Sequence, residues 1–214
     1  MIIVIGCNKG GSGKSTTCVN LAVGLAKQGH EVCIIDADKQ RSSALWYSDR
    51  QTEGHKPEVT LIEAKDNITK AVKTMGEKFD YVVVDVAGRN SRELLTGAAG
   101  ADLLIAPHQC SQFDLDTLEE LQEQLIQVRD LNPNLKAFVY HTMASTNPKV
   151  IEKERSEFLA IVAEFDQLKP MQSIGHYRKI YRDAVSEGKS VLETDNESAK
   201  AEILALIEEV QHGC

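Results

Sequence analysis

A glycine-rich loop near the start of the chain constrains the fold more than any other feature. The segment Asn8–Thr16 (NKGGSGKST) follows a strand-length apolar run at Ile2–Gly6 and leads into an amphipathic segment at Ser15–Gln28. A strand, such a loop and a helix in this order bind phosphate, because glycines turn backbone amides toward the anion and the helix N-terminus adds positive potential. The expected nucleotide-binding residues are Lys9, Gly10, Gly11, Ser12, Gly13, Lys14, Ser15 and Thr16.

Two side chains of this loop carry the expected chemistry. Lys14 is placed to reach the β and γ phosphates, and Ser15 to ligate Mg²⁺. The strict pattern G-x-x-x-x-G-K-[ST] has glycine at its first position, where this chain has Asn8. The alternative is a glycine-rich turn that only caps a helix.

Strand-length apolar runs alternate with helix-length amphipathic stretches along the chain, which is typical of βαβ units around a mostly parallel sheet. Continuous runs such as Val82–Val84 predict strands buried on both faces. We expect an α/β fold, a P-loop NTPase with a mostly parallel, roughly seven-stranded central sheet flanked by helices on both faces. The expected strands are Ile2–Gly6, Val32–Ile35, Val59–Ile62, Tyr81–Val84, Leu103–Ala106, Leu135–Tyr140 and Pro170–Ile174, and the expected helices are Ser15–Gln28, Ser42–Arg50, Asp116–Arg129, Lys149–Phe165, His176–Glu187 and Asn196–Gln211.

Composition limits the class of protein. The 214 residues, 42% hydrophobic and 26% charged, suit a single globular domain over residues 1–214. The apolar run at the start is too short to span a bilayer, and the five cysteines form no C-x-x-C pair. These features predict a reduced, cytoplasmic protein. The net charge of −8 gives no whole-chain argument for a nucleic-acid partner.

The loop has a lysine five residues before the usual one, in the pattern K-G-G-x-G-K-[ST]. This pattern resembles the deviant Walker A motif of the ParA/MinD family of P-loop ATPases. The resemblance implies that Lys9 reaches across a nucleotide-sandwich homodimer to the partner's phosphates. Two positive charges near a triphosphate would neutralise charge in the transition state. The alternative is a solvated loop lysine.

Two further segments resemble the family. Ile34–Gln40 (IIDADKQ) is similar to its D-x-D-P-Q segment, and Phe79–Gly88 is similar to its Walker B strand and switch. Both place carboxylates at the carboxyl ends of parallel strands, where ligands bind in open α/β sheets. The resemblance implies that Asp38 orients or activates the attacking water, that Asp36 supports Mg²⁺ and the loop, and that Asp85 holds the Mg²⁺ shell.

Each aspartate could instead cap a helix or meet solvent at a strand end. Lys39 stands where the family has proline, so the conformation of this loop, and with it the direction of the Asp38 side chain, is left open. The segment Ala101–Leu115 is similar to another family element.

The base of the nucleotide is expected to be adenine. No N/T-K-x-D motif, which reads guanine, follows the sixth strand, so ATP is the expected nucleotide. The loop His141–Asn147, with the stretch around Pro170 and Met171, is expected to line the adenine pocket.

One basic island interrupts the acidic chain. His176–Lys189 has a net charge of +2, whereas the remainder carries −10. Arg178 and Arg182 lie four residues apart, which predicts one shared helix face, with Lys179 adjacent and Lys189 just past the helix end. In the family's partition members a basic patch here holds DNA phosphates, so the resemblance implies salt-sensitive binding of nonspecific DNA. A solvated helix of mixed charge is the alternative. Gly188–Glu193 resembles the G-x-S-V-x-E signature of the same members.

The C-terminal segment Ala201–Val210 argues against a membrane partner. It carries Glu202, Glu208 and Glu209, which anionic lipid repels, so its apolar positions are expected to pack on the core. No helix-turn-helix is expected before the first strand.

The resemblance implies a small ParA-type, Mg²⁺-dependent ATPase that is nucleoid-associated when ATP-bound. Such a protein positions a plasmid, chromosome locus or protein assembly, and a separate adaptor stimulates its hydrolysis of ATP. The alternative is a MinD-like regulator or scaffold that docks on a protein or membrane without binding DNA; a metabolic amidotransfer or reductase ATPase is more remote.

Overall fold

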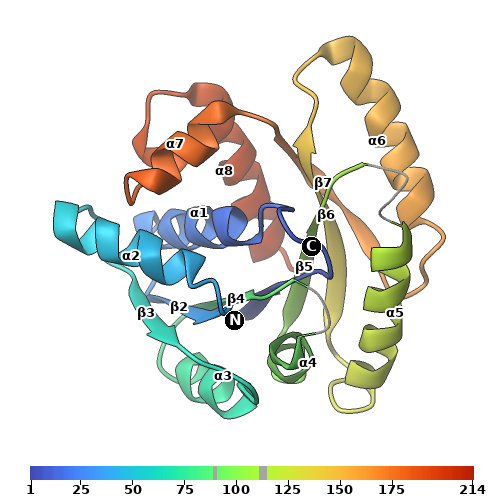
Figure 1. The fold of residues 1–214 in the computed structure, drawn as a ribbon, viewed down its shortest axis with the longest axis horizontal. Helices are drawn as coiled ribbons and strands as arrows, with labels where there is room; N and C mark the ends of the chain where they lie inside the picture. Colours follow the sequence, from blue (N-terminus) through green and yellow to red (C-terminus); the bar gives the residue numbers. More distant parts are fainter. Residues whose placement is uncertain (89–90, 111–114) are drawn as a thin grey trace.

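Seven strands form one sheet in the computed structural model, which describes residues 1–88, 91–110 and 115–214. The strand order is β3-β2-β4-β1-β5-β6-β7, and every neighbouring pair is parallel (Figure 1). The strands are β1 (Ile2–Ile5), β2 (Val32–Ala37), β3 (Thr60–Glu63), β4 (Tyr81–Val86), β5 (Leu103–His108), β6 (Lys136–Ala144) and β7 (Lys169–His176). The expected α/β architecture is confirmed.

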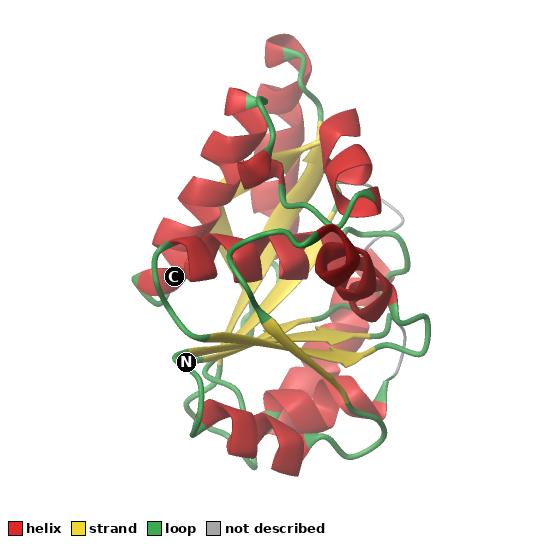
Figure 2. Ribbon diagram, turned by 90° about the vertical axis from the view of Figure 1, so that its left-hand side faces the viewer, coloured by secondary structure: helices red, strands yellow, loops and turns green. Residues whose placement is uncertain are grey.

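Helices cover both faces of this sheet, which lies between them in Figure 2. Alternation along each strand sends successive side chains to opposite faces. Ile3 and Ile5 of β1 therefore lie in one core, and Val4 lies in the other. The first core includes side chains of α1 (Lys14–Lys27), α2 (Ser42–Glu53), α7 (Lys179–Ser186) and α8 (Glu197–Gln211), and the second includes those of α3 (Thr69–Gly76), α4 (Arg92–Ala98), α5 (Leu115–Arg129) and α6 (Pro148–Val162).

Helix α1 is buried along most of its length because α8 and α2 pack against it as well as the sheet. Gly24 permits the close contact with α8. A Cβ atom built on Gly24 would lie 2.1 Å from Cδ1 of Ile207. This packing fixes the helix whose first residues belong to the glycine-rich loop.

The carboxylates of α8 turn toward the edge strand β7. Glu209 accepts hydrogen bonds from the amides of Gln172 and Ser173, at 2.7 and 2.8 Å. Glu202 accepts one from the amide of His176, at 3.1 Å. The apolar face of α8 packs in the core, as expected, and two of its acidic residues cover backbone donors of an edge strand.

A buried ion pair joins α2 to the segment after α7. The guanidinium of Arg50 is almost fully buried and donates to both carboxylate oxygens of Glu193, at 2.8 and 3.0 Å. It also donates to the carbonyl of Gly188, whose φ of 68° brings the chain against the backbone of Arg50. Glu193 ends the short 3-10 helix η2 (Val191–Glu193) and completes a capping box with Ser190. The G-K-S-V-L-E segment thus closes onto α2.

Three expectations about elements need correction. The short helices α3 and α4 were not expected. β7 runs on to His176, so α7 begins at Lys179, three residues later than the expected helix start. Arg178 precedes α7 in an extended conformation, so it does not share a helix face with Arg182. Among the described residues, none of the helices is long and apolar enough to cross a membrane.

Candidate functional site

The glycine-rich loop has the backbone conformation that its sequence predicts. Gly11 and Gly13 have φ angles of 71° and 90°, in the left-handed region that glycine adopts without a steric penalty. The hydroxyl of Thr142, on β6, donates to the carbonyl of Ser12 at 2.9 Å. The loop is therefore tied to the sheet at its turn, directly before α1.

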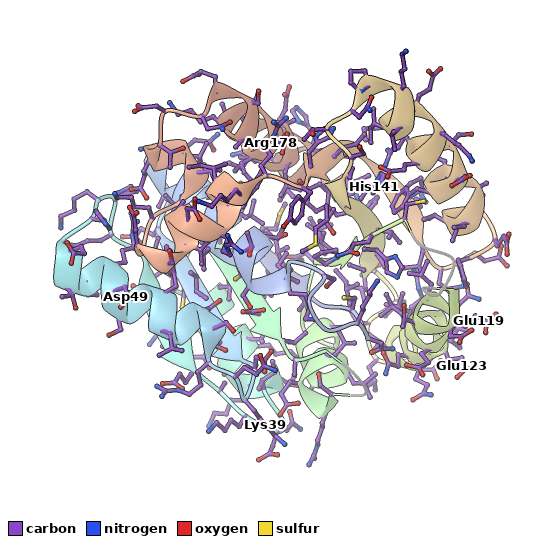
Figure 3. The ribbon with its side chains drawn as sticks, turned by 45° about the horizontal axis from the view of Figure 1, so that its top comes forward. Lys39, Asp49, Glu119, Glu123, His141 and Arg178 are labelled. Carbon is purple, nitrogen blue, oxygen red and sulfur yellow. The ribbon has the colours of Figure 1, made fainter. Side chains whose placement is uncertain are left out.

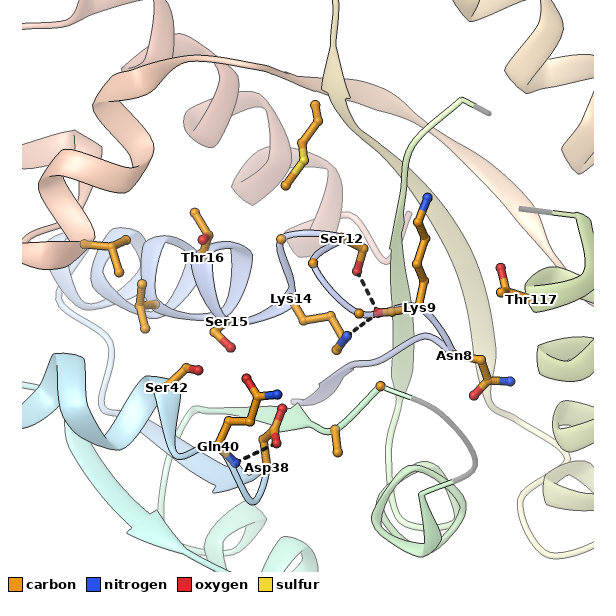
Figure 4. A pocket seen from close by; sticks show the side chains of 18 residues that line it. Asn8, Lys9, Ser12, Lys14, Ser15, Thr16, Asp38, Gln40, Ser42 and Thr117 are labelled. Carbon is orange, nitrogen blue, oxygen red and sulfur yellow. Dashed lines mark hydrogen bonds between the residues drawn. The ribbon is translucent and has the colours of Figure 1, made fainter. Parts of the chain in front are cut away.

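Lys14 is held by the loop to which it belongs. Its Nζ atom donates a 2.6 Å hydrogen bond to the carbonyl of Lys9, as Figure 4 shows. The Lys9 side chain extends away from Lys14 in the same view. Gly88, after β4, lies close to both, because a Cβ atom there would be 2.9 Å from the Lys9 carbonyl oxygen and 3.0 Å from Nζ of Lys14. The loop and the segment after β4 therefore meet at the lysine.

A pocket of about 900 Å³ opens over this loop. It brings together the glycine-rich loop, the connection after β2 and the segment after β4, which are separated in sequence but adjacent at the carboxyl edge of the parallel sheet. The residues lining it include all eight predicted nucleotide-binding residues, namely Lys9, Gly10, Gly11, Ser12, Gly13, Lys14, Ser15 and Thr16, and also Asp38, Gln40 and Gly88.

Asp36 and Asp38 have different environments. Both carboxylate oxygens of Asp36 accept backbone hydrogen bonds, from Asp38 at 3.0 Å and from Ala44 at 2.7 Å. Asp36 thereby shapes the connection between β2 and α2, and burial raises the pKa of its carboxyl. Asp38 lines the pocket, and its Oδ1 accepts from the amide of Gln40. Lys39, in the usual proline position, is exposed at the tip of this connection (Figure 3).

Asp85 is fully buried at the end of β4. Its Oδ2 accepts a 2.7 Å hydrogen bond from the hydroxyl of Ser43, and its Oδ1 has no hydrogen-bond partner among the described residues. Burial raises the pKa of Asp85 to about 7, while the hydroxyls of Ser43 and Ser15 act in the opposite direction. A buried carboxylate oxygen without a donor favours a cation or its bound water as partner.

The donor set fits Mg²⁺ bound together with a nucleotide. The described residues contain no group of three or more His, Cys, Asp or Glu side chains suited to holding a metal alone. Mg²⁺ typically uses one or two protein ligands and completes its shell with phosphate oxygens and water. Ser15 in the pocket and Asp85 beneath it are the residues that would hold it, whereas both oxygens of Asp36 already accept backbone hydrogen bonds.

A second, mainly apolar pocket of about 460 Å³ adjoins the first at Gly13, Thr16 and Met143. The other residues lining it include Thr142 near the end of β6 and, around the end of β7 and the start of α7, Gly175–Lys179, Tyr181 and Arg182. Of the segments expected to line an adenine pocket, His141–Asn147 contributes Thr142 and Met143 to this pocket, and its first four residues belong to β6 and not to a loop. Pro170 and Met171 are not among the residues that line it. Met171 is fully buried in the core, because β7 extends to His176 and its carboxyl edge lies further along the chain.

The part of the chain that contains the glycine-rich loop matches a known family. The family model for the ATPase MipZ matches residues 1–144, which contain the glycine-rich loop and all three aspartates. The chain belongs to the MipZ family of ATPases. Relatives named ParA place this family within the ParA/MinD group of P-loop ATPases.

Relatives of this MipZ-family chain include proteins named for partition and distribution. It is 33% identical over 116 residues to Protein ParA of Rhizobium radiobacter, which covers 53% of the chain but only 50% of that protein's length. It is 26% identical to the maintenance of carboxysome distribution protein A of Halothiobacillus neapolitanus, over 94% of the chain and 92% of the relative. A plasmid partition protein of Borrelia burgdorferi solved with AMPPNP has the same fold, with a TM-score of 0.74, 20% identity and coverage of 100% and 99%.

The predicted DNA-binding residues of this MipZ-family chain lie around α7 and carry nearby acidic partners. Arg178, labelled in Figure 3, donates from Nε to Glu202 at 2.7 Å. Lys179 and Lys189 form ion pairs with Asp183 and Glu187, at 3.2 and 2.8 Å. The side chains of Lys179 and Arg182 are 75% and 76% exposed.

Several residues of the site escaped sequence reasoning. Ser43, which donates to Asp85, was not predicted, because an isolated serine forms no motif. Thr142 lies in the segment His141–Asn147 that was expected at the site, but its hydrogen bond to the carbonyl of Ser12 was not predicted. Asn8, in the position of the usual glycine, donates to Gln124 of α5 at 3.2 Å and so connects the loop to that helix. Residues 111–114 of the family-like segment Ala101–Leu115 lie outside the described residues.

Proposed function

We propose that the chain is a Mg²⁺-dependent ATPase switch that dimerises on binding ATP and positions a cargo. The observation that carries this proposal is the convergence of Lys14, Ser15 and Asp38 on one pocket, above the buried oxygen of Asp85 that lacks a donor. Phosphates would replace the Lys9 carbonyl as the partner of Lys14, and the loop amides would bind their oxygens. Bound Mg²⁺ supplies neutralisation of the phosphate charge.

Hydrolysis in this proposal depends on Asp38. Its carboxylate lies in the pocket with the loop and can orient water toward the terminal phosphate. Lys9 from a second copy would add positive charge at the same phosphate. The adenine ring would occupy the adjoining apolar pocket, whose wall includes Met143 and Tyr177. Binding of ATP would thus assemble both the site and the dimer.

DNA and an adaptor are the proposed partners. Exposed Lys179 and Arg182 would contact phosphates of nonspecific DNA, doubled in the dimer, and an adaptor on the cargo would accelerate hydrolysis. The relatives named for chromosome partition and carboxysome distribution support a positioning role for this chain. The test is retardation of random-sequence DNA by the protein with ATP, compared with ADP and with no nucleotide. We expect retardation with ATP that weakens as salt is added, and no retardation with ADP or without nucleotide. Absence of retardation under all three conditions would refute DNA binding.

A second candidate is a regulator that docks on a protein and does not bind DNA. It is favoured by the local balance of the basic segment, in which Arg178, Lys179 and Lys189 each have an acidic neighbour within 3.2 Å. The double variant Lys179→Glu/Arg182→Glu separates the candidates. Loss of DNA retention with normal ATP binding supports the DNA switch. Unchanged retention removes this segment from the DNA-binding surface. No retention by the wild-type protein with ATP, together with normal ATP binding, favours the regulator.

A further inference from the structure

Ser43 joins the metal-site carboxylate to helix α2. It lies in the first turn of this helix, has no exposed surface, and donates its hydroxyl proton to Oδ2 of Asp85 at 2.7 Å. The next amide, that of Ala44, donates to Asp36 at 2.7 Å. One turn of helix therefore binds carboxylates from two neighbouring strands, β2 and β4.

The bond distinguishes the two oxygens of a carboxylate that would otherwise be equivalent. A hydroxyl has one proton, so donation to Oδ2 satisfies that oxygen and leaves Oδ1 as an acceptor. Oδ1 has no hydrogen-bond partner among the described residues, and Asp85 is closed to bulk water. Rotation of the carboxylate would break the bond to Ser43 without gaining solvent. The hydroxyl therefore holds Asp85 in one orientation.

We propose that Ser43 is a positioning residue for the magnesium site, which orients Asp85 so that Oδ1 accepts from the hydration shell of the cation. This inference rests on the proposed function, because it needs a nucleotide-bound Mg²⁺ above Asp85. Outer-shell partners of metal ligands typically change metal affinity about 10–100-fold when removed. For a single neutral hydroxyl we expect the lower end of this range, about tenfold.

The experiment measures magnesium affinity separately from nucleotide affinity. A fluorescent ATP analogue is titrated into the protein in EDTA, and Mg²⁺ is then titrated at fixed nucleotide. For Ser43→Ala, the Mg²⁺ midpoint should rise about tenfold, with analogue binding in EDTA unchanged within twofold. Ser43→Cys, measured in reductant, should also raise the midpoint, because a thiol fills the space but donates weakly. Ser48→Ala, an exposed serine on the same helix, is the matched control.

Two results would overturn the role of Ser43. One is an unchanged Mg²⁺ midpoint in folded Ser43→Ala or Ser43→Cys protein. The other is an equal loss of analogue binding in EDTA and in Mg²⁺, which means that the hydroxyl supports only the fold. If the wild-type protein shows no Mg²⁺-dependent binding of the analogue, the proposed function and the inference fail together. If the wild-type protein shows such binding and the Ser43 variants have the same Mg²⁺ midpoint, only the role of Ser43 is refuted.

Discussion

Replacement of Arg50 by methionine tests how strongly the buried ion pair stabilises the fold. Methionine keeps most of the length of the side chain but removes the guanidinium, which donates four hydrogen bonds to Glu193, Gly188 and Pro57. Breaking a buried ion pair from one side costs about 3–5 kcal/mol. Glu193 keeps its bond from the amide of Ser190, so we expect the lower end, about 3 kcal/mol of unfolding free energy.

Chemical denaturation followed by circular dichroism measures this loss. Arg41→Met is the matched control, because Arg41 also makes a bidentate pair, with Glu63, but both side chains are exposed. Exposed pairs contribute about 0.2–1 kcal/mol. A loss for Arg50→Met no larger than that for Arg41→Met would refute the argument. Arg50→Met/Glu193→Gln, which removes both charges, should recover part of the loss.

The pH dependence gives an independent test of the same pair. Burial opposes ionisation of Glu193, but hydrogen bonds from Arg50 and the amide of Ser190 lower its pKa below the usual value. A carboxyl with a lowered folded-state pKa stabilises the protein fully above its unfolded pKa, about 4.3, and loses that contribution as the pH falls. The difference in stability between wild type and Arg50→Met should therefore shrink below about pH 4.

Three other substitutions test the site and the fold. Lys14→Ala should abolish ATP binding in calorimetry, because it removes the cation of the loop. Asp38→Ala should bind ATP and accumulate as a DNA-associated dimer in gel filtration; phosphate release at the wild-type rate would exclude Asp38 from catalysis. Gly188→Ala should lower the unfolding free energy more than Gly54→Ala. Both glycines have positive φ, but only at Gly188 would the new Cβ lie 2.4 Å from a backbone nitrogen.

The strands and the phosphate loop were predictable because local pattern determines them. Val82–Val84 is apolar on both faces, as a central parallel strand requires, and the glycines of the loop stand where left-handed backbone occurs. Helices α3 and α4 have only eight and seven residues, too few for a helical period to stand out. The carboxylates were found because their segments resemble family motifs, which place them at the carboxyl ends of strands that meet at one edge of the sheet.

Contacts between distant segments were not predictable. The charge pattern of residues 176–189 suggested an arginine pair on one helix face, but Arg178 binds Glu202, 24 residues further along the chain. Ser43 and Asp85 are 42 residues apart, and Arg50 and Glu193 are 143 apart. In a single sequence the members of such pairs are isolated polar residues that form no local motif. Their effect on stability depends on burial, which only the folded structure shows.

The carboxylates of α8 have a consequence for how copies of the chain can associate. Amides of Gln172, Ser173 and His176 on the edge strand β7 already donate to Glu209 and Glu202. A peptide that joined the sheet here would have to displace these carboxylates and leave them without donors. The sheet is thus protected from growth at β7. The proposed dimerisation at the loop edge would therefore not compete with fibre-like stacking of strands on this side.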